Sequence, residues 1–322
     1  TGNHIQCETK RITWDESPSK GPITRQDLER AVQATSRVAV APTRELLHVI
    51  PRSYVLDGQT GIRNPIGMHA LHLDVETHLV TGAMGPIENL VHSVEGASVK
   101  VHGLVLEPFA SGEAILSRDE REVGVALIDI GGGTSDMAVF HQGAIWHTAI
   151  IPVGGYQLTN DLSIALGIPY AEAERLKVTY GHAIPEEMDD NEPVECIGFD
   201  GSTIKILKRE ISEILSDRCK ELLHLTLHHA QEAGLDGLPL GGFVFTGGSA
   251  TLPGLEQLAR DIIPGHVRIG APTNLDGNGD AILGQGVAKA AADEFNGGTS
   301  VMFIRKRDVV VAGLNFRINQ MY

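Results

Sequence analysis

The chain has 322 residues and a mass of 34.5 kDa, and its 26 basic and 41 acidic side chains give it a net charge of −15. A chain of this length exceeds the usual size of one hydrophobic core, so we expect at least two subdomains. The excess of acidic groups repels phosphate backbones and argues against nucleic-acid binding.

The cysteines and the first residues favour a cytoplasmic protein. Cys7, Cys196 and Cys219 are odd in number and widely spaced, which argues against a disulfide framework and fits a reducing compartment. The sequence contains no apolar run of about 18 residues, and its N-terminal residues lack the basic and apolar regions of a signal peptide. The chain begins with Thr1 rather than Met, so we expect a fragment of a longer protein.

Short strands and one helix are predicted for residues 1–80. Thr24 with Asp27 three residues later is typical of a helix start. Residues 45–51 should be extended, and Pro51 should end this strand or place it at a sheet edge. Residues 70–80 alternate apolar and polar side chains, which predicts a strand with one buried and one exposed face. A helix over 86–96 and a strand over 101–106 follow.

The most informative segment is the turn Gly131-Gly132-Gly133-Thr134, which follows the apolar strand 125–130. Glycines lack a Cβ, so their backbone N–H groups can approach a phosphate closely. Asp129 would hold the water shell of a Mg²⁺ ion, and Thr134 would offer a further hydrogen bond. A glycine-rich hairpin between 125–130 and 137–140 explains the same pattern and is compatible with this interpretation. We predict a nucleotide-phosphate site here.

Two further glycine pairs each precede a predicted helix. Gly154 and Gly155 precede a helix over 156–166, whose free N–H groups would point toward a second phosphate contact. The alternative for this pair is an ordinary glycine-containing loop that connects a strand to a helix. Gly247 and Gly248 follow a buried strand and precede a helix over 255–261, so an adenine or ribose could lie against bare backbone.

The segment between these pairs should contain two helices. The first carries Glu174 and Lys177, which share one face and form an exposed ion pair on spacing alone. Residues 186–192 are acidic and should form a solvated loop. The second helix, 209–233, is long and amphipathic. Its His224 and His228 lie one turn apart, but no nearby carboxylate or cysteine completes a metal site.

The order of these segments resembles the superfamily of actin, the sugar kinases and the heat-shock chaperone ATPases. The segments that carry this resemblance are Asp129 to Asp136, Gly154-Gly155, Glu174 with Lys177-Val178, Thr246-Gly247-Gly248 and 283–288. Five further segments are similar to the FtsA family of bacterial cell-division proteins, and that resemblance runs from about residue 3 to about 290. They are 48–51, 61–67, Ala110-Ser111, 119–124 and 267–272.

This resemblance implies an α/β protein with an actin-like fold, built from two ribonuclease-H-like halves with ATP in the cleft. It implies a 1C (SHS2-like) subdomain at 1–80 and the remainder of subdomain 1A at 81–122. Subdomain 2A would comprise 123–166 and 241–290, subdomain 2B would comprise 167–240, and 291–322 would be a C-terminal tail of uncertain structure.

The resemblance also assigns nucleotide contacts. It implies that Asp129 holds the Mg²⁺ shell, that the loop from Gly131 to Thr134 binds phosphate, and that Gly154 and Gly155 lie beside it. Glu174 and Lys177 would lie near the ribose and adenine rather than form a surface ion pair. Gly247, Gly248 and Ser249 would form the adenosine loop. No catalytic residue is assigned, and ATP hydrolysis in this family is slow or absent.

The implied function is that of a cell-division scaffold. Such a protein binds ATP and Mg²⁺, polymerises with itself, links the tubulin-like FtsZ ring to the cytoplasmic side of the cell membrane and recruits later division proteins. The FtsZ C-terminal tail would bind at about 167–240. One alternative is a PilM-like adaptor of pilus assembly, which also has a 1C-type subdomain. A less favoured one is a sugar-kinase-type phosphotransferase, which needs a carboxylate base that spacing does not identify.

Two parts of the chain depart from the family pattern. The first phosphate loop has no counterpart, because the chain begins at what resembles the start of 1C. We therefore expect weak ATP binding, little hydrolysis and an uncovered sheet edge. FtsA proteins end in an amphipathic membrane helix, whereas 301–322 has a strand-like pattern with four basic side chains and one acidic one. Anionic lipid would attract these charges, but the missing helical period disfavours membrane contact.

Overall fold

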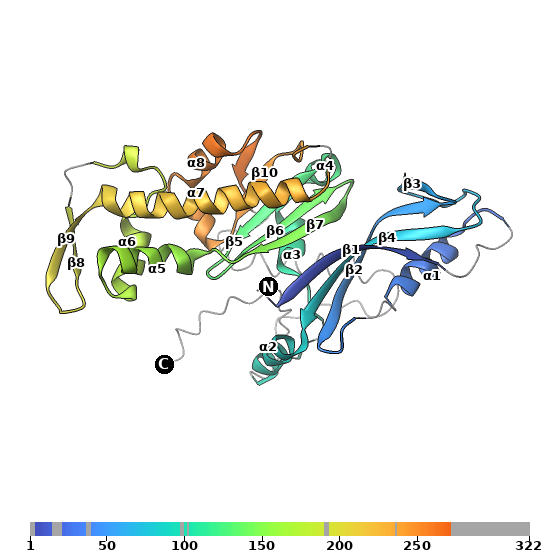
Figure 1. Cartoon of the computed structure of the whole chain (residues 1–322), viewed down its shortest axis with the longest axis horizontal. Helices are drawn as coiled ribbons and strands as arrows, with labels where there is room; N and C mark the ends of the chain where they lie inside the picture. Colours follow the sequence, from blue (N-terminus) through green and yellow to red (C-terminus); the bar gives the residue numbers. More distant parts are fainter. Residues whose placement is uncertain are drawn as a thin grey trace.

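The computed structural model describes residues 4–14, 21–36, 40–96, 100–101, 103–189, 193–235 and 237–271. Figure 1 shows an elongated molecule with a four-stranded sheet at one end, a five-stranded sheet in the middle and a group of helices at the other end. Among the described helices, none is both long enough and apolar enough to cross a lipid bilayer.

The N-terminal sheet is antiparallel and has the order β1-β4-β2-β3. Its strands are β1 (Ile5–Thr13), β2 (Arg44–Leu56), β3 (Gln59–Ile62) and β4 (Leu73–Ala83). Helix α1 (Arg25–Thr35) packs on it through Ala31, which lies in one core with Leu73 and Val75. Thr24 and Asp27 form a reciprocal capping box, as predicted, so two backbone N–H groups at the helix start are satisfied.

Pro51 does not end its strand, because β2 continues to Leu56 with an irregular register between Pro51 and Ser53. The alternative expectation, a sheet edge, is confirmed. Strand β3 pairs only with the end of β2, so Pro51 pairs with β4 alone and its other edge has no neighbouring strand.

Strand β4 shows the predicted alternation only in its first half. Leu73 and Val75 are buried between less buried neighbours, but every residue from Thr77 to Gly82 is buried. In the second half of β4, the face that was expected to be exposed is covered by β7 (Ala144–Ile151). There His78 Nε2 lies 2.9 Å from the hydroxyl oxygen of Thr148. The expectation of one exposed face is therefore wrong for this part of the strand.

The central sheet has the order β11-β10-β5-β6-β7. Strands β5 (Val125–Ile130), β6 (Ser135–His141) and β7 are antiparallel, whereas β10 (Phe243–Thr246) and β11 (Val267–Ile269) run parallel to β5. All six residues of β5 are buried. Alternate residues of β5 enter separate cores: Ala126 and Ile128 pack on one face, and Val125 and Leu127 pack on the other.

Helices cover both faces of this sheet. The core that contains Ile128 includes side chains of α5 (Gly155–Leu166), α6 (Tyr170–Tyr180), α7 (Lys208–Glu232) and α8 (Leu255–Ile262). The opposite face carries α3 (Glu107–Ile115) and α4 (Arg118–Val123). The remaining described elements are α2 (Met84–Gly96), the β8–β9 hairpin (Pro193–Ile197 and Thr203–Leu207) and two short 3₁₀ helices, η1 (Pro185–Glu187) and η2 (Gly248–Thr251).

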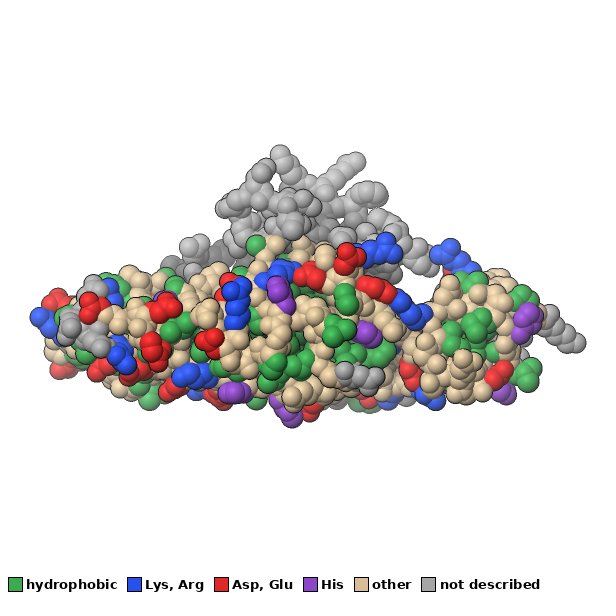
Figure 2. Space-filling model, turned by 90° about the horizontal axis from the view of Figure 1, so that it is seen from above, with side chains coloured by type: hydrophobic (Ala, Val, Ile, Leu, Met, Phe, Trp, Pro, Cys, Tyr) green, Lys and Arg blue, Asp and Glu red, His purple; other side chains and the backbone are tan. Residues whose placement is uncertain are grey.

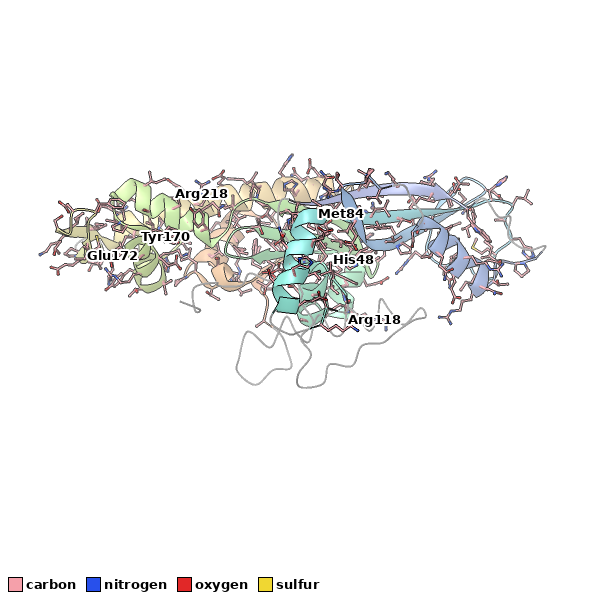
Figure 3. The ribbon with its side chains drawn as sticks, turned by 90° about the horizontal axis from the view of Figure 1, so that it is seen from below. His48, Met84, Arg118, Tyr170, Glu172 and Arg218 are labelled. Atoms are coloured by element: carbon pink, nitrogen blue, oxygen red, sulfur yellow. The ribbon has the colours of Figure 1, made fainter. Side chains whose placement is uncertain are left out.

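The described residues among 101–106 do not form the predicted strand, and Val105 makes an isolated bridge. The backbone N–H of Leu106 donates instead to Nε2 of His48, at 2.9 Å, and Leu106 is the N-cap of α3. Figure 3 shows His48 near the middle of the molecule, whereas Tyr170, Glu172 and Arg218 lie toward the end formed by α5, α6 and α7. The far end of that group carries intermingled acidic and basic side chains (Figure 2).

Candidate nucleotide site

The Gly131–Thr134 turn joins β5 to β6, so the hairpin interpretation is confirmed. The N–H of Gly131 donates to the carbonyl of Thr134 at 2.9 Å, which closes the turn. Gly132 and Gly133 are exposed, and a Cβ added at either one would meet no atom within 4 Å. The backbone at these two glycines therefore faces open space that a ligand can enter. Phosphate binding by this loop stays a prediction.

Two carboxylates lie behind this turn. Asp129 is buried, and the hydroxyl of Ser111 donates to its Oδ2 at 2.7 Å. Asp136 stands opposite Asp129 in the ladder and accepts from the hydroxyl of Thr134 at 3.1 Å. Burial raises the pKa of Asp129 above its usual value. The hydrogen bond from Ser111 lowers this pKa, and the negative charge of Asp136 raises it further. A hydrated divalent cation would offset the charge of this acidic pair.

Gly154 and Gly155 bring the start of α5 against the turn. The N–H groups of Gly155 and Tyr156 donate to the carbonyls of Gly131 and Gly132, at 2.9 and 2.6 Å. A Cβ at Gly154 would lie 2.8 Å from the carbonyl oxygen of Gly131, so only glycine fits there. The expectation of free N–H groups at this helix start is wrong, because the turn's own carbonyls occupy them. Nucleotide contact by Gly154 and Gly155 stays a prediction.

Glu174 and Lys177 share one face of α6 and form the ion pair expected from their spacing, with 2.7 Å between Lys177 Nζ and Glu174 Oε2. The ammonium also donates to the carbonyl of Gly155 at 3.0 Å and to the hydroxyl of Thr159 at 2.7 Å. Only 13% of the Lys177 side chain is exposed, so the pair connects α6 to α5 instead of lying free on the surface. Their role as nucleotide contacts stays a prediction.

The Gly247–Ser249 segment approaches the turn from β10. Gly247 has a φ of 91°, and a Cβ there would lie 2.5 Å from Oδ1 of Asp129. The hydroxyl of Ser249 donates to the carbonyl of Gly131 at 3.2 Å. All the segments predicted to bind nucleotide therefore meet around one turn, and the carbonyl of Gly131 accepts from both Gly155 and Ser249.

Sequence reasoning did not assign Ser111 and Thr159 to this site. Ser111 holds Asp129 from α3, and Thr159 links Lys177 to the start of α5. The helix that carries Ser111 was not predicted, whereas Thr159 lies in the helix expected after Gly154 and Gly155 and was not singled out within it. The only available signal for Thr159 was its position four residues after Gly155, one helical turn along α5.

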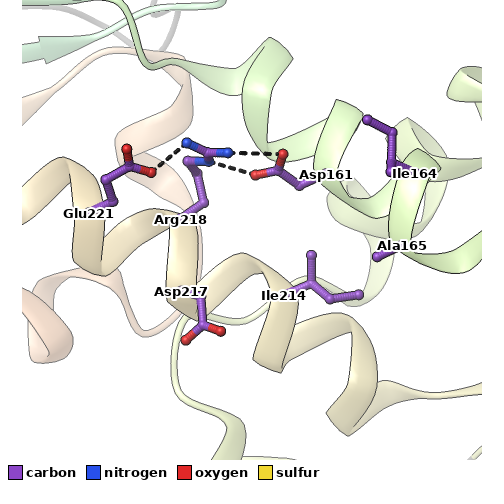
Figure 4. A pocket seen from close by; sticks show the side chains of 7 residues that line it. All are labelled: Asp161, Ile164, Ala165, Ile214, Asp217, Arg218 and Glu221. Carbon is purple, nitrogen blue, oxygen red and sulfur yellow. Dashed lines mark hydrogen bonds and ion pairs between the residues drawn. The ribbon is translucent and has the colours of Figure 1, made fainter.

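A separate hollow of about 410 Å³ lies between α5 and α7 (Figure 4). Arg218 crosses it and donates two hydrogen bonds to Asp161, at 2.6 and 3.1 Å, and a third to Glu221. The remaining lining residues are Ile164, Ala165, Ile214 and Asp217. The residues that line this hollow do not include those of the turn.

Comparisons with known proteins identify relatives for most of the chain. The family model of cell division protein FtsA matches residues 126–292, and the model of the SHS2 domain inserted in FtsA matches residues 2–81. The model of the type IV pilus assembly protein PilM matches residues 45–191.

Three curated relatives are cell division proteins FtsA. The chain is 36% identical to the protein of Neisseria meningitidis serogroup B, covering 87% of this chain and 68% of the relative. It is 36% identical to the Bacillus subtilis protein, covering 84% of this chain and 62% of that relative. It is 35% identical to the protein of Escherichia coli K12, covering 86% of this chain and 67% of that relative. The chain thus spans about two thirds of the length of these relatives.

Solved structures show the fold. The PilM–PilN type IV pilus biogenesis complex aligns with a TM-score of 0.56 at 14% identity, over 83% of this chain and 67% of that one. MreB 5 of Spiroplasma citri bound to AMPPNP aligns with a TM-score of 0.50 at 18% identity, over 66% and 65%. These similarities and the SHS2 match confirm the expected actin-like α/β fold. The subdomain boundaries stay a prediction, and residues 272–322, which include the 283–288 segment and the basic tail, lie outside the described residues.

Proposed function

This chain belongs to the FtsA family of bacterial cell-division proteins, and from this we propose that it is an actin-like division scaffold that binds ATP at the Gly131–Thr134 turn. The observation that carries the proposal is that two glycine segments, Gly154–Gly155 and Gly247–Ser249, meet at the glycine turn, where a Cβ added at Gly132 or Gly133 would enter open space. An actin-like protein of similar fold, MreB 5, has been solved with AMPPNP bound.

In this proposal the exposed amides of Gly132 and Gly133 bind the phosphates. Asp129, whose carboxylate lies just behind them, holds Mg²⁺ through water. Glu174 and Lys177 lie beside Gly155 and would face the ribose and adenine, with the Gly247–Ser249 segment against the adenosine. When bound, Mg²⁺ would neutralise phosphate charge and the acidic pair at the same time.

Titration of the chain with a fluorescent ATP analogue, with and without Mg²⁺, tests this proposal. We expect Asp129→Asn, which keeps the shape of the side chain, to abolish the Mg²⁺ enhancement of binding. Asp119→Asn on the exposed start of α4 is the matched control and should behave as the unchanged chain. Equal Mg²⁺ enhancement in both variants, with both shown to be folded, would exclude Asp129 from the ion's shell.

We further propose that the chain links the FtsZ ring to the cytoplasmic side of the cell membrane, assembles with itself and recruits later division proteins. The FtsZ C-terminal tail would bind within 167–240. That region exposes apolar side chains a peptide can cover, namely Tyr170, Val178, Ile197, Phe199 and Leu207. Fluorescence anisotropy of a labelled tail peptide, with a scrambled peptide as control, tests this. Equal binding of the two peptides, or binding of neither, would overturn the assignment.

A pilus-assembly adaptor is the second candidate, and the observations that favour it are the PilM model match over 45–191 and the structural similarity to the PilM–PilN complex. The two candidates differ in the peptide that they accept. Saturable binding of a PilN peptide and none of the FtsZ tail would favour the pilus adaptor over the division scaffold.

A further inference from the structure

Three side chains of the metal-ligating kind meet at the C-terminal end of α7, away from the candidate nucleotide site. His147 comes from β7, and His229 and Glu232 come from the last turn of α7. One ligand atom from each residue lies within 4.8 Å of the other two. Figure 1 shows this end of α7 beside the strands of the central sheet, and α7 and β7 are in contact.

The placement follows from helical spacing and differs from the sequence prediction. His229 and Glu232 are three residues apart, so they share a face, and His229 Nδ1 lies 2.8 Å from Glu232 Oε2. The pair considered from the sequence, His224 and His228, lies on the exposed side of the helix. The sequence identified no carboxylate for a metal site on this helix, and in the structure Glu232 takes that place. One of the two imidazoles, that of His147, comes from strand β7.

One feature of His147 points to a ligand. Its Nε2 is buried, and it has no hydrogen-bond partner among the residues that the structure describes. Buried polar atoms usually have a partner in the protein, in ordered water or in a bound ion. A metal ion bound by this nitrogen would supply such a partner.

The donor set selects the kind of ion. Two imidazoles and one carboxylate are a donor set found in zinc sites that keep a fourth position for water. Mg²⁺ and Ca²⁺ prefer oxygen ligands and would gain little from imidazole. Zinc bonds of about 2.0–2.1 Å place neighbouring ligand atoms about 3.3 Å apart. The three ligand atoms now lie within 4.8 Å of one another, so binding requires a small rotation of the side chains, which is easiest for the exposed Glu232.

We propose that His147, His229 and Glu232 bind Zn²⁺ and clamp the end of α7 to β7. Strand β7 is also the strand on which β1, β2 and β4 of the N-terminal sheet pack. The ion therefore stabilises the junction of the two sheets. The guanidinium of Arg52 lies 3.8 Å from the ring centroid of Trp146, next to His147, and its charge opposes cation binding, so affinity depends on the carboxylate of Glu232.

The test is zinc binding by the untagged, chelator-treated chain, measured by isothermal titration and by thermal unfolding with and without Zn²⁺. We expect one ion per chain and a higher melting temperature with zinc. His147→Ala and Glu232→Gln should each weaken binding by about tenfold or more and lose the thermal shift. Because Glu232 is exposed, its variant keeps the test valid if His147→Ala fails to fold.

The matched control is the double variant His224→Ala/His228→Ala, which removes a helix-borne pair of imidazoles but keeps the proposed ligands. His228 also approaches Glu232, with 3.5 Å between Nε2 and Oε1, so this control asks whether His228 is the real ligand. Unchanged zinc affinity in the control supports the proposal. Three outcomes would overturn it. The first is a loss of zinc affinity in the control while His147→Ala keeps it, the second is an equal loss in all variants, and the third is no saturable zinc binding by the unchanged chain.

Discussion

Gly247 is the position where the structure makes its sharpest stability prediction. Its φ of 91° lies in a region that residues with a Cβ rarely adopt. A Cβ there would lie 2.5 Å from Oδ1 of Asp129. It would also lie 2.6 Å from the carbonyl oxygen of Ile130 and 2.8 Å from the backbone nitrogen of Ile130. Two of these atoms are backbone of β5, which is buried along its whole length, so they cannot move aside. Gly247→Ala must therefore strain the chain or shift η2 away from β5.

The expected cost combines two effects. An unfavourable positive φ costs roughly 1–2 kcal/mol, and overpacking in a rigid core costs about 1–3 kcal/mol. We expect Gly247→Ala to lower the free energy of unfolding by about 2–5 kcal/mol in total. Gly248→Ala is the matched control, because its φ is not positive and an added Cβ would meet no atom within 4 Å.

Urea unfolding followed by far-UV circular dichroism and by tryptophan fluorescence measures both variants. Of the two tryptophans, Trp146 lies in β7, in the same sheet as β5, and Trp14 lies in the core of the N-terminal sheet. A loss below about 1 kcal/mol for Gly247→Ala, or an equal loss for the control, would refute the argument from the close approach to Asp129.

Three further predictions concern packing, an ion pair and a buried histidine. Gly112→Ala would place a Cβ 2.3 Å from the fully buried ring of Phe140, so we expect a loss of about 1–3 kcal/mol, partly recovered when Phe140→Leu is added in a double-mutant cycle. Lys177→Met removes the ammonium that joins α5 to α6 and should cost about 1–3 kcal/mol in urea unfolding, whereas the exposed Lys220→Met should cost almost nothing. Burial lowers the pKa of His78 to about 4, so the unfolded chain binds the proton more readily and stability falls as the pH drops from 6.5 toward 4. The loss reaches about 3 kcal/mol, and stability measured across this range should depend less on pH in His78→Gln.

The sequence predicted what depends on neighbouring residues in the chain. The helix start at Thr24, the hairpin around the Gly131–Thr134 turn and the end of α5 at Leu166 are local, because each is fixed by residues within about one turn. The glycine segments of the site were recognised for the same reason. Their sequence positions alone marked three places where the backbone approaches something closely.

What the sequence could not predict depends on contacts between distant segments. The alternation in β4 indicates one buried face, and nothing local shows that β7 covers the other. Leu106 has the apolar neighbours of a strand, but its amide binds His48, which is 58 residues away. The meeting of His147 with His229 has the same origin, because it requires the end of a 25-residue helix to reach β7.

The glycines of the candidate site divide into two groups, and this division decides which variants report on a ligand. Gly154 and Gly247 are needed by the fold itself, since a Cβ at either one would overlap the turn or β5. Lost nucleotide binding in variants of these two would therefore report misfolding as readily as a missing contact. A Cβ added at Gly132 or Gly133 would meet no atom within 4 Å, and neither residue has a positive φ. Gly133→Ala should leave stability unchanged, so weaker nucleotide binding by this variant would identify the backbone there as a phosphate contact, and unchanged binding would exclude it.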